Sequence, residues 1–202
     1  MALLDWISPE PGLWLEGEQV RLRAPRASDF EEWRALREVS QAFLQPWEPT
    51  WPADDLSRAS FRRRLSAYAR DRDLGAAYPF FVLRRGDEAL TGGITLSNIR
   101  RGVAQMGSVG YWCGQPFARN GYTLAAVKTL ATFAFRTLGL HRLEAACLPS
   151  NGPSRKLLRR AGFVEEGEAK AYLKINGVWA DHVLFGLVSP APDLGADEAV
   201  SV

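Results

Sequence analysis

The sequence has few of the residues that metal centres and disulfide frameworks require. Its 202 residues include two cysteines, Cys113 and Cys147, and two histidines, and no C-x-x-C spacing occurs. Structural zinc sites and disulfide-stapled scaffolds depend on clusters of such residues. We therefore expect no metal ion, no disulfide and a reducing, cytoplasmic environment.

Long hydrophobic runs and a strong excess of charge are also missing. No stretch of about 18 apolar residues occurs, so we expect no transmembrane helix. Residues 1–14 carry Asp5 and Glu10 and no basic residue, which is unlike a secretory signal. The net charge of +2 is too small to predict binding to nucleic acid. The hydrophobic fraction of 47% is typical of a globular protein. The sequence therefore predicts no membrane partner and requires no direct binding to nucleic acid.

The chain is expected to form one domain over residues 1–188. Its length suits a single domain, and no repeat or low-complexity linker divides it. Residues 189–202 read SPAPDLGADEAVSV, with three acids, no basic residue and no periodicity. We expect this acidic tail to be mobile.

Patterning predicts a mixture of helices and strands. A capping box of Ser28 and Glu31 indicates the start of an amphipathic helix. Its expected apolar face consists of Phe30, Trp33, Leu36 and Val39. Asp54 and Asp55 are expected to open a second helix, whose Arg62-Arg63-Arg64 run would face solvent. Further helices are expected over 121–138 and 153–161, stopped by Gly139 and Gly162.

The expected strands are short and separated by turn residues. Alternation or apolar runs indicate strands over 20–24, 78–83, 89–99, 106–113, 143–148, 172–175 and 179–188. Asn176-Gly177 is a strong signal for a two-residue hairpin turn. The order is β-α-α-β-β-β-α-β-α-β-β, which predicts an α+β fold around a mixed sheet.

The segment from strand 106–113 into helix 121–138 is the best candidate for an anion site. A loop that leads into a helix N-terminus presents free backbone N–H groups at the positive end of the helix dipole. Gly121 permits close approach of a ligand, and Arg119 adds a positive charge. No P-loop or dinucleotide fingerprint is present, but a pyrophosphate suits such a site.

Several segments resemble one enzyme family in the same order along the chain. They are FLQPWEP at 43–49, SNIRRG at 97–102, SNGPSRKLLRRAGFVEEG at 150–167 and AYLKINGVWADHVLFGL at 171–187. Together they resemble the ribosomal-protein-alanine (Rim-type) branch of the GNAT N-acetyltransferase superfamily, over about residues 18–190. In the family, the corresponding loop reads [QR]-x-x-G-x-[GA]; in Ala118–Thr123 only the central glycine, Gly121, matches it. Arg119 would then replace the cation of the family motif.

The resemblance implies the GNAT fold, with a mainly antiparallel sheet, one splayed parallel strand pair and flanking helices. It also implies acetyl-CoA as cosubstrate and transfer of its acetyl group to an amine. The residues it assigns to acetyl-CoA binding are Tyr111, Trp112 and Cys113 on the strand, Arg119, Asn120, Gly121, Tyr122 and Thr123 at the loop and helix, and Asn151. It places the Ser154 hydroxyl near the CoA sulfur as general acid. Capping of the next helix is the structural alternative for Asn151 and Ser154.

The general base is the part of the site that the sequence defines least. Many relatives carry a glutamate where this chain has Ser108. Glu48, in the P-W-E-P loop, is the candidate, with Asp181 as a second and an ordered water as the alternative. His141 and His182 are expected to be structural.

The expected reaction is direct attack of the amine on the thioester in a ternary complex, since no Cys-His dyad is evident. The acceptor is expected to be the N-terminal α-amine of a protein such as a ribosomal protein. Two alternatives stay open: a small-molecule amine, and a catalytically silent acyl-CoA-binding module.

Overall fold

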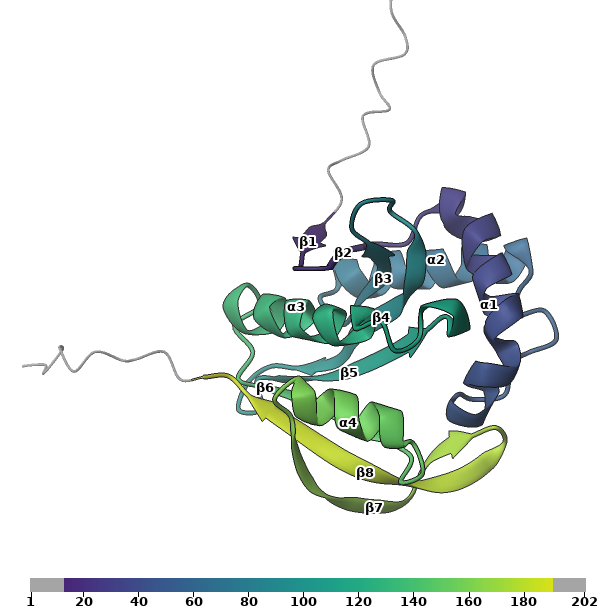
Figure 1. The fold of residues 1–202 in the computed structure, drawn as a ribbon. Coiled ribbons are helices and arrows are strands. Elements are labelled where there is room, and N and C mark those ends of the chain that lie inside the picture. Colours follow the sequence, from purple (N-terminus) through teal and green to yellow (C-terminus); the bar gives the residue numbers. More distant parts are fainter. Residues whose placement is uncertain (1–12, 191–202) are drawn as a thin grey trace, which may run out of the picture.

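A single sheet of eight strands passes through the molecule in the order β1-β2-β3-β4-β5-β6-β8-β7 (Figure 1). The structure, a computed structural model, describes residues 13–190, so the predicted tail lies outside it apart from its first two residues. The strands are β1 (Trp14–Glu16), β2 (Val20–Arg23), β3 (Tyr78–Arg84), β4 (Leu90–Arg100), β5 (Met106–Cys113), β6 (Arg142–Cys147), β7 (Val164–Ile175) and β8 (Val178–Val188). The helices are α1 (Phe30–Leu44), α2 (Arg58–Asp73), α3 (Tyr122–Arg136) and α4 (Gly152–Arg160).

The sheet is antiparallel except where β5 lies beside β6. The parallel pair is joined by the crossover through α3, as expected for a βαβ unit. Gly139 and Gly162 follow α3 and α4 with positive φ values of 64° and 97°, which confirms them as helix stops. The predicted mixed, mainly antiparallel sheet with flanking helices is thereby confirmed.

The two faces of the sheet carry different helices, and the alternation of β3 shows how. Phe80 and Val82 join the core that contains Val127 and Leu130 of α3. Phe81, between them in sequence, joins the second core with residues of α1 and α2. Because successive side chains of a strand point to opposite faces, α3 covers one face and α1 with α2 the other (Figure 1).

The start of α1 differs from the prediction. A short 3₁₀ turn, Ala27–Asp29, precedes the helix, and Asp29 accepts a hydrogen bond from the Arg26 backbone N–H at 2.7 Å. The Asp29 side chain thus binds the segment before the helix, and it also forms a buried ion pair with Arg23 at 2.7 Å. No side chain of the described residues caps the first turn of α1, so the predicted capping box of Ser28 and Glu31 is not formed. Val39, predicted on the apolar face, is 60% exposed.

The second helix begins later than predicted. Ser57 caps α2 by accepting from the Ser60 N–H at 3.0 Å, so Asp54 and Asp55 lie before the helix rather than in its first turn. The Ser57 side chain stabilises the helix start, and the two aspartates instead form ion pairs with Arg63 and Arg64.

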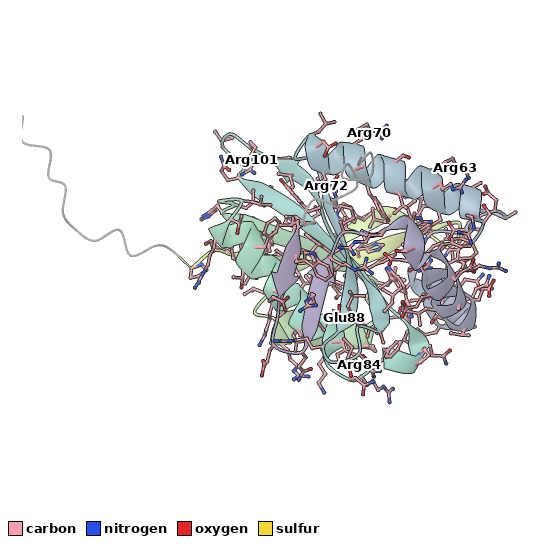
Figure 2. All side chains as sticks on the ribbon, turned by 90° about the horizontal axis from the view of Figure 1, so that it is seen from above. Arg63, Arg70, Arg72, Arg84, Glu88 and Arg101 are labelled. Carbon is pink, nitrogen blue, oxygen red and sulfur yellow. The ribbon has the colours of Figure 1, made fainter. Side chains whose placement is uncertain are left out.

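The arginine run on α2 divides between two environments. Arg63 and Arg70 point away from the sheet into solvent (Figure 2), with 63% and 71% of their side chains exposed. Arg64 turns inward, where it pairs with the buried Asp55. The solvent prediction is thus right for Arg63 and wrong for Arg64.

The C-terminal hairpin is longer than predicted. β7 begins at Val164 instead of residue 172. The prediction missed residues 164–171 because this part of the strand is almost wholly exposed and shows no apolar alternation. A bulge with Ala171 at a φ of 46° bends the hairpin, and the turn at Asn176-Gly177 forms as expected. The Asn176 N–H donates to the Glu48 carbonyl at 2.9 Å, which joins the hairpin tip to the P-W-E-P loop.

Both cysteines are expected to be free thiols in the purified protein. Cys113 ends β5 and Cys147 ends β6, two strands that no longer pair at these positions, and neither forms a disulfide in the structure. Thiol titration of the denatured, unreduced protein should find two thiols per chain. Finding none, in a chain that runs as a monomer on a non-reducing gel, would contradict this expectation.

Candidate active site

The parallel strands β5 and β6 separate soon after they meet. They pair only through Met106–Ser108 and Arg142–Glu144, while β5 stays paired with β4 as far as Cys113. From residue 109 onward the edge of β5 that faces β6 has no partner strand. Unpaired strand edges offer N–H and C=O groups to whatever lies beside them. Tyr111, Trp112 and Cys113, the predicted backbone contacts, lie on this edge.

The N-terminus of α3 lies just beyond the open end of β5. Gly121 precedes the helix with a φ of 85°, a conformation that favours glycine. The N–H groups of residues 119–124 find no acceptor among the described residues, although Ala125 already donates to the Gly121 carbonyl. These donors and the helix dipole suit a pyrophosphate. The predicted loop residues Arg119, Asn120, Tyr122 and Thr123 surround this turn.

The space between β5 and β6 beyond their last paired residues, Ser108 and Glu144, is called the gap below. The N-terminus of α4 faces β5 across this gap. Asn151 caps the helix by accepting from the Ser154 N–H at 3.1 Å, so the capping alternative holds for Asn151. The Ser154 hydroxyl is free of that task and lies 2.7 Å from the Tyr111 hydroxyl. The gap is therefore spanned by one side-chain hydrogen bond rather than by backbone pairing.

Burial keeps the ionisable groups at the gap in their neutral forms. It raises the pKa of Tyr111 to about 12, with hydrogen bonding to Ser154 acting in the opposite direction. Burial also raises the pKa values of the Cys113 and Cys147 thiols above their usual range. Neither cysteine is thus activated as a thiolate nucleophile.

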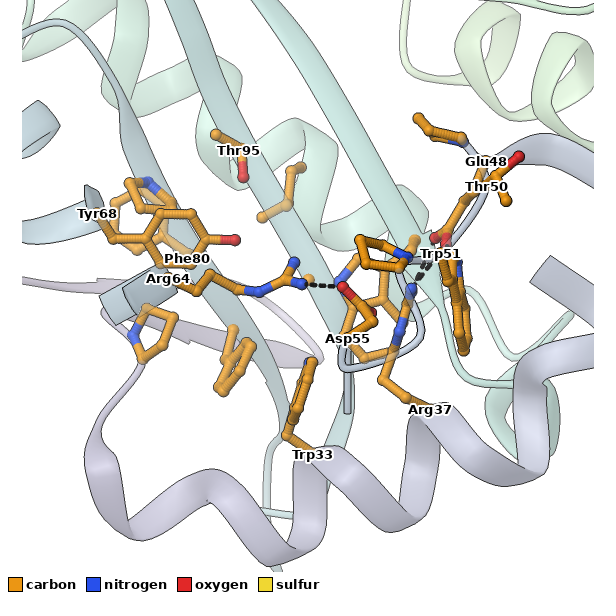
Figure 3. A pocket seen from close by; sticks show the side chains of 18 residues that line it. Trp33, Arg37, Glu48, Thr50, Trp51, Asp55, Arg64, Tyr68, Phe80 and Thr95 are labelled. Carbon is orange, nitrogen blue, oxygen red and sulfur yellow. Dashed lines mark hydrogen bonds and ion pairs between the residues drawn. The ribbon is translucent and has the colours of Figure 1, made fainter. Parts of the chain in front are cut away.

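On the opposite face of the sheet, α1, α2 and the loop between them enclose a pocket of about 320 Å³ (Figure 3). Trp33, Trp51 and Trp112 line it together with prolines of the loop. Four charged side chains also line the pocket: Arg37, Glu48, Asp55 and Arg64. An aromatic pocket with a few placed polar groups is typical of a small-ligand or peptide-end site.

Glu48 lies in this pocket and is held by three donors. The Arg37 guanidinium forms a bidentate pair with its carboxylate at 2.8 and 2.7 Å, and the Trp51 indole N–H donates at 2.7 Å. Arg37 itself is buried, with its guanidinium 4.0 Å from the Trp51 ring centre and 5.0 Å from that of Trp112. These contacts fix the P-W-E-P loop against α1 (Figure 3).

The pocket and the gap are joined along β5. The Trp112 side chain lines the pocket, whereas Tyr111 points to the other face and meets α4. Gly110 pairs with Thr95, a pocket residue of β4, and nothing lies within 4 Å of the point where its Cβ would be. The absent side chain therefore leaves open space at this point of β5.

The second base candidate lies elsewhere. Asp181 accepts from the Ala171 N–H at 2.8 Å and pairs with Lys170 at 2.9 Å, and these donors lower the pKa of its carboxyl. It supports the hairpin bulge. His182 is buried with its Nδ1 2.9 Å from the Ala180 carbonyl, in agreement with a structural role.

Sequence reasoning missed three charged residues of the pocket: Arg37, Asp55 and Arg64. Arg37 follows Trp33 by four residues and therefore shares its buried helix face, which is a signal that periodicity could have shown. The inward turn of Arg64 had no such signal.

Among residues 13–190, no group of three or more His, Cys, Asp or Glu side chains is arranged to hold a metal ion.

None of the described helices is long and apolar enough to cross a membrane.

The acetyltransferase (GNAT) domain family matches residues 19–164 of this chain. The probable N-acetyltransferase YjcK of Bacillus subtilis is 31% identical over 176 residues, which cover 87% of this chain and 97% of that protein. The [ribosomal protein uS5]-alanine N-acetyltransferase of Escherichia coli is 32% identical over 172 residues, or 84% of this chain and 89% of that one.

Solved structures show the same likeness. RimJ of Mycobacterium smegmatis, in complex with CoA-disulfide, superposes with a TM-score of 0.81 at 30% identity, covering 90% of this chain and 88% of the other. The predicted family resemblance is therefore confirmed. The chain belongs to the GNAT acetyltransferase family and is an N-acetyltransferase, similar to the ribosomal-protein-alanine N-acetyltransferases.

Proposed function

We propose that this enzyme transfers the acetyl group of acetyl-CoA to the N-terminal α-amine of a protein, such as a ribosomal protein. The observation that carries the proposal is the open edge of β5, which has a free helix N-terminus at one end and a separate pocket on the other face of the sheet. Two substrates can reach one strand from opposite faces. The name of the similar E. coli enzyme, a ribosomal-protein-alanine N-acetyltransferase, supports the choice of acceptor. A cytoplasmic location is part of this proposal, since ribosomal proteins are cytoplasmic.

The residues of the gap fit acetyl-CoA. The free N–H groups of residues 119–124 would hold the pyrophosphate, with Arg119 beside them. The unpaired backbone of Tyr111, Trp112 and Cys113 would bind the pantetheine amides, and the Asn151 side chain lies at the opposite wall of the gap. Acetyl-CoA supplies the activated acyl group.

Ser154 is the proposed general acid, and Tyr111 positions it. With its pKa at about 12, Tyr111 stays protonated and can donate its hydroxyl hydrogen to the Ser154 oxygen. The Ser154 hydroxyl hydrogen is then available to the departing sulfur. Direct attack by the amine is proposed because neither cysteine is activated, and because orientation of two bound substrates supplies much of the catalysis.

Glu48 stays the candidate base of this proposal. It lies in the acceptor pocket, but three protein donors already reach its carboxylate. A water in the pocket can carry the proton between the amine and Glu48. Through the same contacts Glu48 also holds the loop that forms one wall of the pocket.

The proposed acceptor can be tested by following CoA release with a panel of peptides and small amines. We expect peptides with a free N-terminus to be acetylated with a higher kcat/KM than polyamines, aminoglycosides or amino acids, because the residues after the N-terminus can contact the exposed Pro49 and Thr50 that line the pocket. N-terminally blocked peptides serve as the control. A preference for a small amine would contradict the acceptor assignment, and no CoA release with any amine would indicate a silent binding module.

Substitution of Gly121 by alanine should weaken acetyl-CoA binding at least tenfold, about 1.4 kcal/mol. A side chain at a φ of 85° costs about 1–2 kcal/mol and displaces the N–H groups of the turn. Gly139→Ala is the matched control, since Gly139 also has a positive φ, of 64°, with nothing within 4 Å of its Cβ position. Calorimetric titration that shows equal affinity for the two variants would overturn the pyrophosphate assignment.

Substitution of Ser154 by alanine should slow the chemical step about tenfold to a hundredfold. The melting temperature should change little, because Asn151 rather than the Ser154 hydroxyl caps α4. Tyr111→Phe, which removes only the donor to Ser154, should give a smaller loss of the same kind. A normal single-turnover rate in Ser154→Ala would remove Ser154 from the catalytic machinery.

A further inference from the structure

The two carboxylates of the acceptor pocket, Glu48 and Asp55, differ in how many hydrogen bonds their oxygens accept from the protein. Both oxygens of Glu48 accept hydrogen bonds, from Arg37 and from the Trp51 indole. Asp55 accepts one side-chain hydrogen bond, from Arg64 to its Oδ1 at 2.8 Å. Its Oδ2 has no donor among the described residues.

The free oxygen belongs to a well-buried side chain. Asp55 is 8% exposed, and it lies where the loop passes beneath α2 and borders the pocket. Figure 3 shows Asp55 facing Arg64 on one side, with Arg37, Glu48 and Trp51 on the other. Oδ2 is not among the fully buried atoms that lack a partner, so it is open to the pocket, where an N–H group of a ligand can take the place of water.

From this arrangement we infer that Asp55 binds the amino group of the acceptor, through its Oδ2, as a primary ammonium before transfer. The inference rests on the proposed function and names the residue that recognises the α-amine. A primary ammonium offers three N–H donors, and a charge-assisted hydrogen bond to a buried carboxylate is strong.

The pocket offers an ammonium further oxygen acceptors besides Asp55. Its three tryptophans already have arginine side chains over their rings, Arg64 over Trp33 and Arg37 over Trp51 and Trp112, so hydrogen bonds rather than these rings would hold a ligand cation. The hydroxyl groups of Tyr68 and Thr95 also line the pocket, and no partner among the described residues binds them. They are further acceptors for the N–H groups that Asp55 leaves unpaired.

The pocket also borders the strand that would hold the thioester. Thr95 lines the pocket on β4 and pairs with Gly110 of β5, beside which there is open space. After the ammonium has given one proton to water, the free amine can leave Asp55 and attack the carbonyl carbon of the thioester. The C–N bond forms as the C–S bond breaks, and the CoA sulfur leaves with the Ser154 hydroxyl proton. The second proton of the nitrogen passes through water and restores the Ser154 hydroxyl.

The competing explanation is that Asp55 only balances the charge of Arg64. Removal of either partner would then have the same effect. The two explanations differ in their consequences for ligand binding, because only the amine-binding role depends on the charge of the ligand's N-terminus.

Calorimetric titrations of the enzyme–CoA complex with two peptides separate the explanations. The probes are Ala-Ala-Ala amide, with a free N-terminus, and its N-acetylated form. We expect the wild type to bind the free amine at least tenfold more tightly. Asp55→Asn should abolish this preference, while Arg64→Gln, which breaks the same ion pair, should keep it. CoA affinity and melting temperature report whether each variant is folded, and Asp55→Ser replaces Asp55→Asn if that variant is not.

Three results would overturn the inference: no preference for the free amine in the wild type, a preference retained by the folded Asp55 variant, or an equal loss in both variants. The proposed function is tested separately by acetyl transfer to the same free peptide. Transfer with an unchanged preference in Asp55→Asn would refute the role of Asp55 alone. Binding with the expected preference but without transfer would refute the proposed function alone.

Discussion

The separation of β5 from β6 is the constraint on which the site depends. Two parallel strands that begin as neighbours exchange backbone hydrogen bonds over three residues and then part, although each keeps its other partner in the sheet. Buried backbone groups without partners are unfavourable. The protein accepts that cost on one edge of β5, and the proposed acetyl-CoA site is where the missing partners would be supplied.

The alternation of β5 lets one strand serve both halves of the site. Tyr111 points toward α4 and the proposed cosubstrate side, while Trp112 lines the pocket beneath α1 and α2. Gly110, two residues before Trp112, adds no side chain and has open space beside it. A strand with period-two side chains can in this way separate the two proposed ligands while its backbone lies between them.

Much of this frame could be predicted from the sequence. β5, α3 and α4 have strong local signals, an apolar run or helical period closed by glycine, and their bounds agree with the structure within two residues. β7 was predicted too short because an exposed edge strand needs no apolar alternation. Of the four charged residues that line the pocket, the sequence predicts only Glu48 as part of the site. Asp55 and Arg64 could not be found, since their inward position depends on which of several capping residues starts α2, and Ser57 rather than either aspartate does so.

The hydrogen bond from the Asn176 N–H to the Glu48 carbonyl joins segments that lie 128 residues apart in the sequence. The P-W-E-P loop, which lines the pocket, is therefore held by the final hairpin of the chain. During synthesis this loop leaves the ribosome long before the hairpin that supports it. This contact of the proposed acceptor pocket can thus form only when nearly the whole chain has been made.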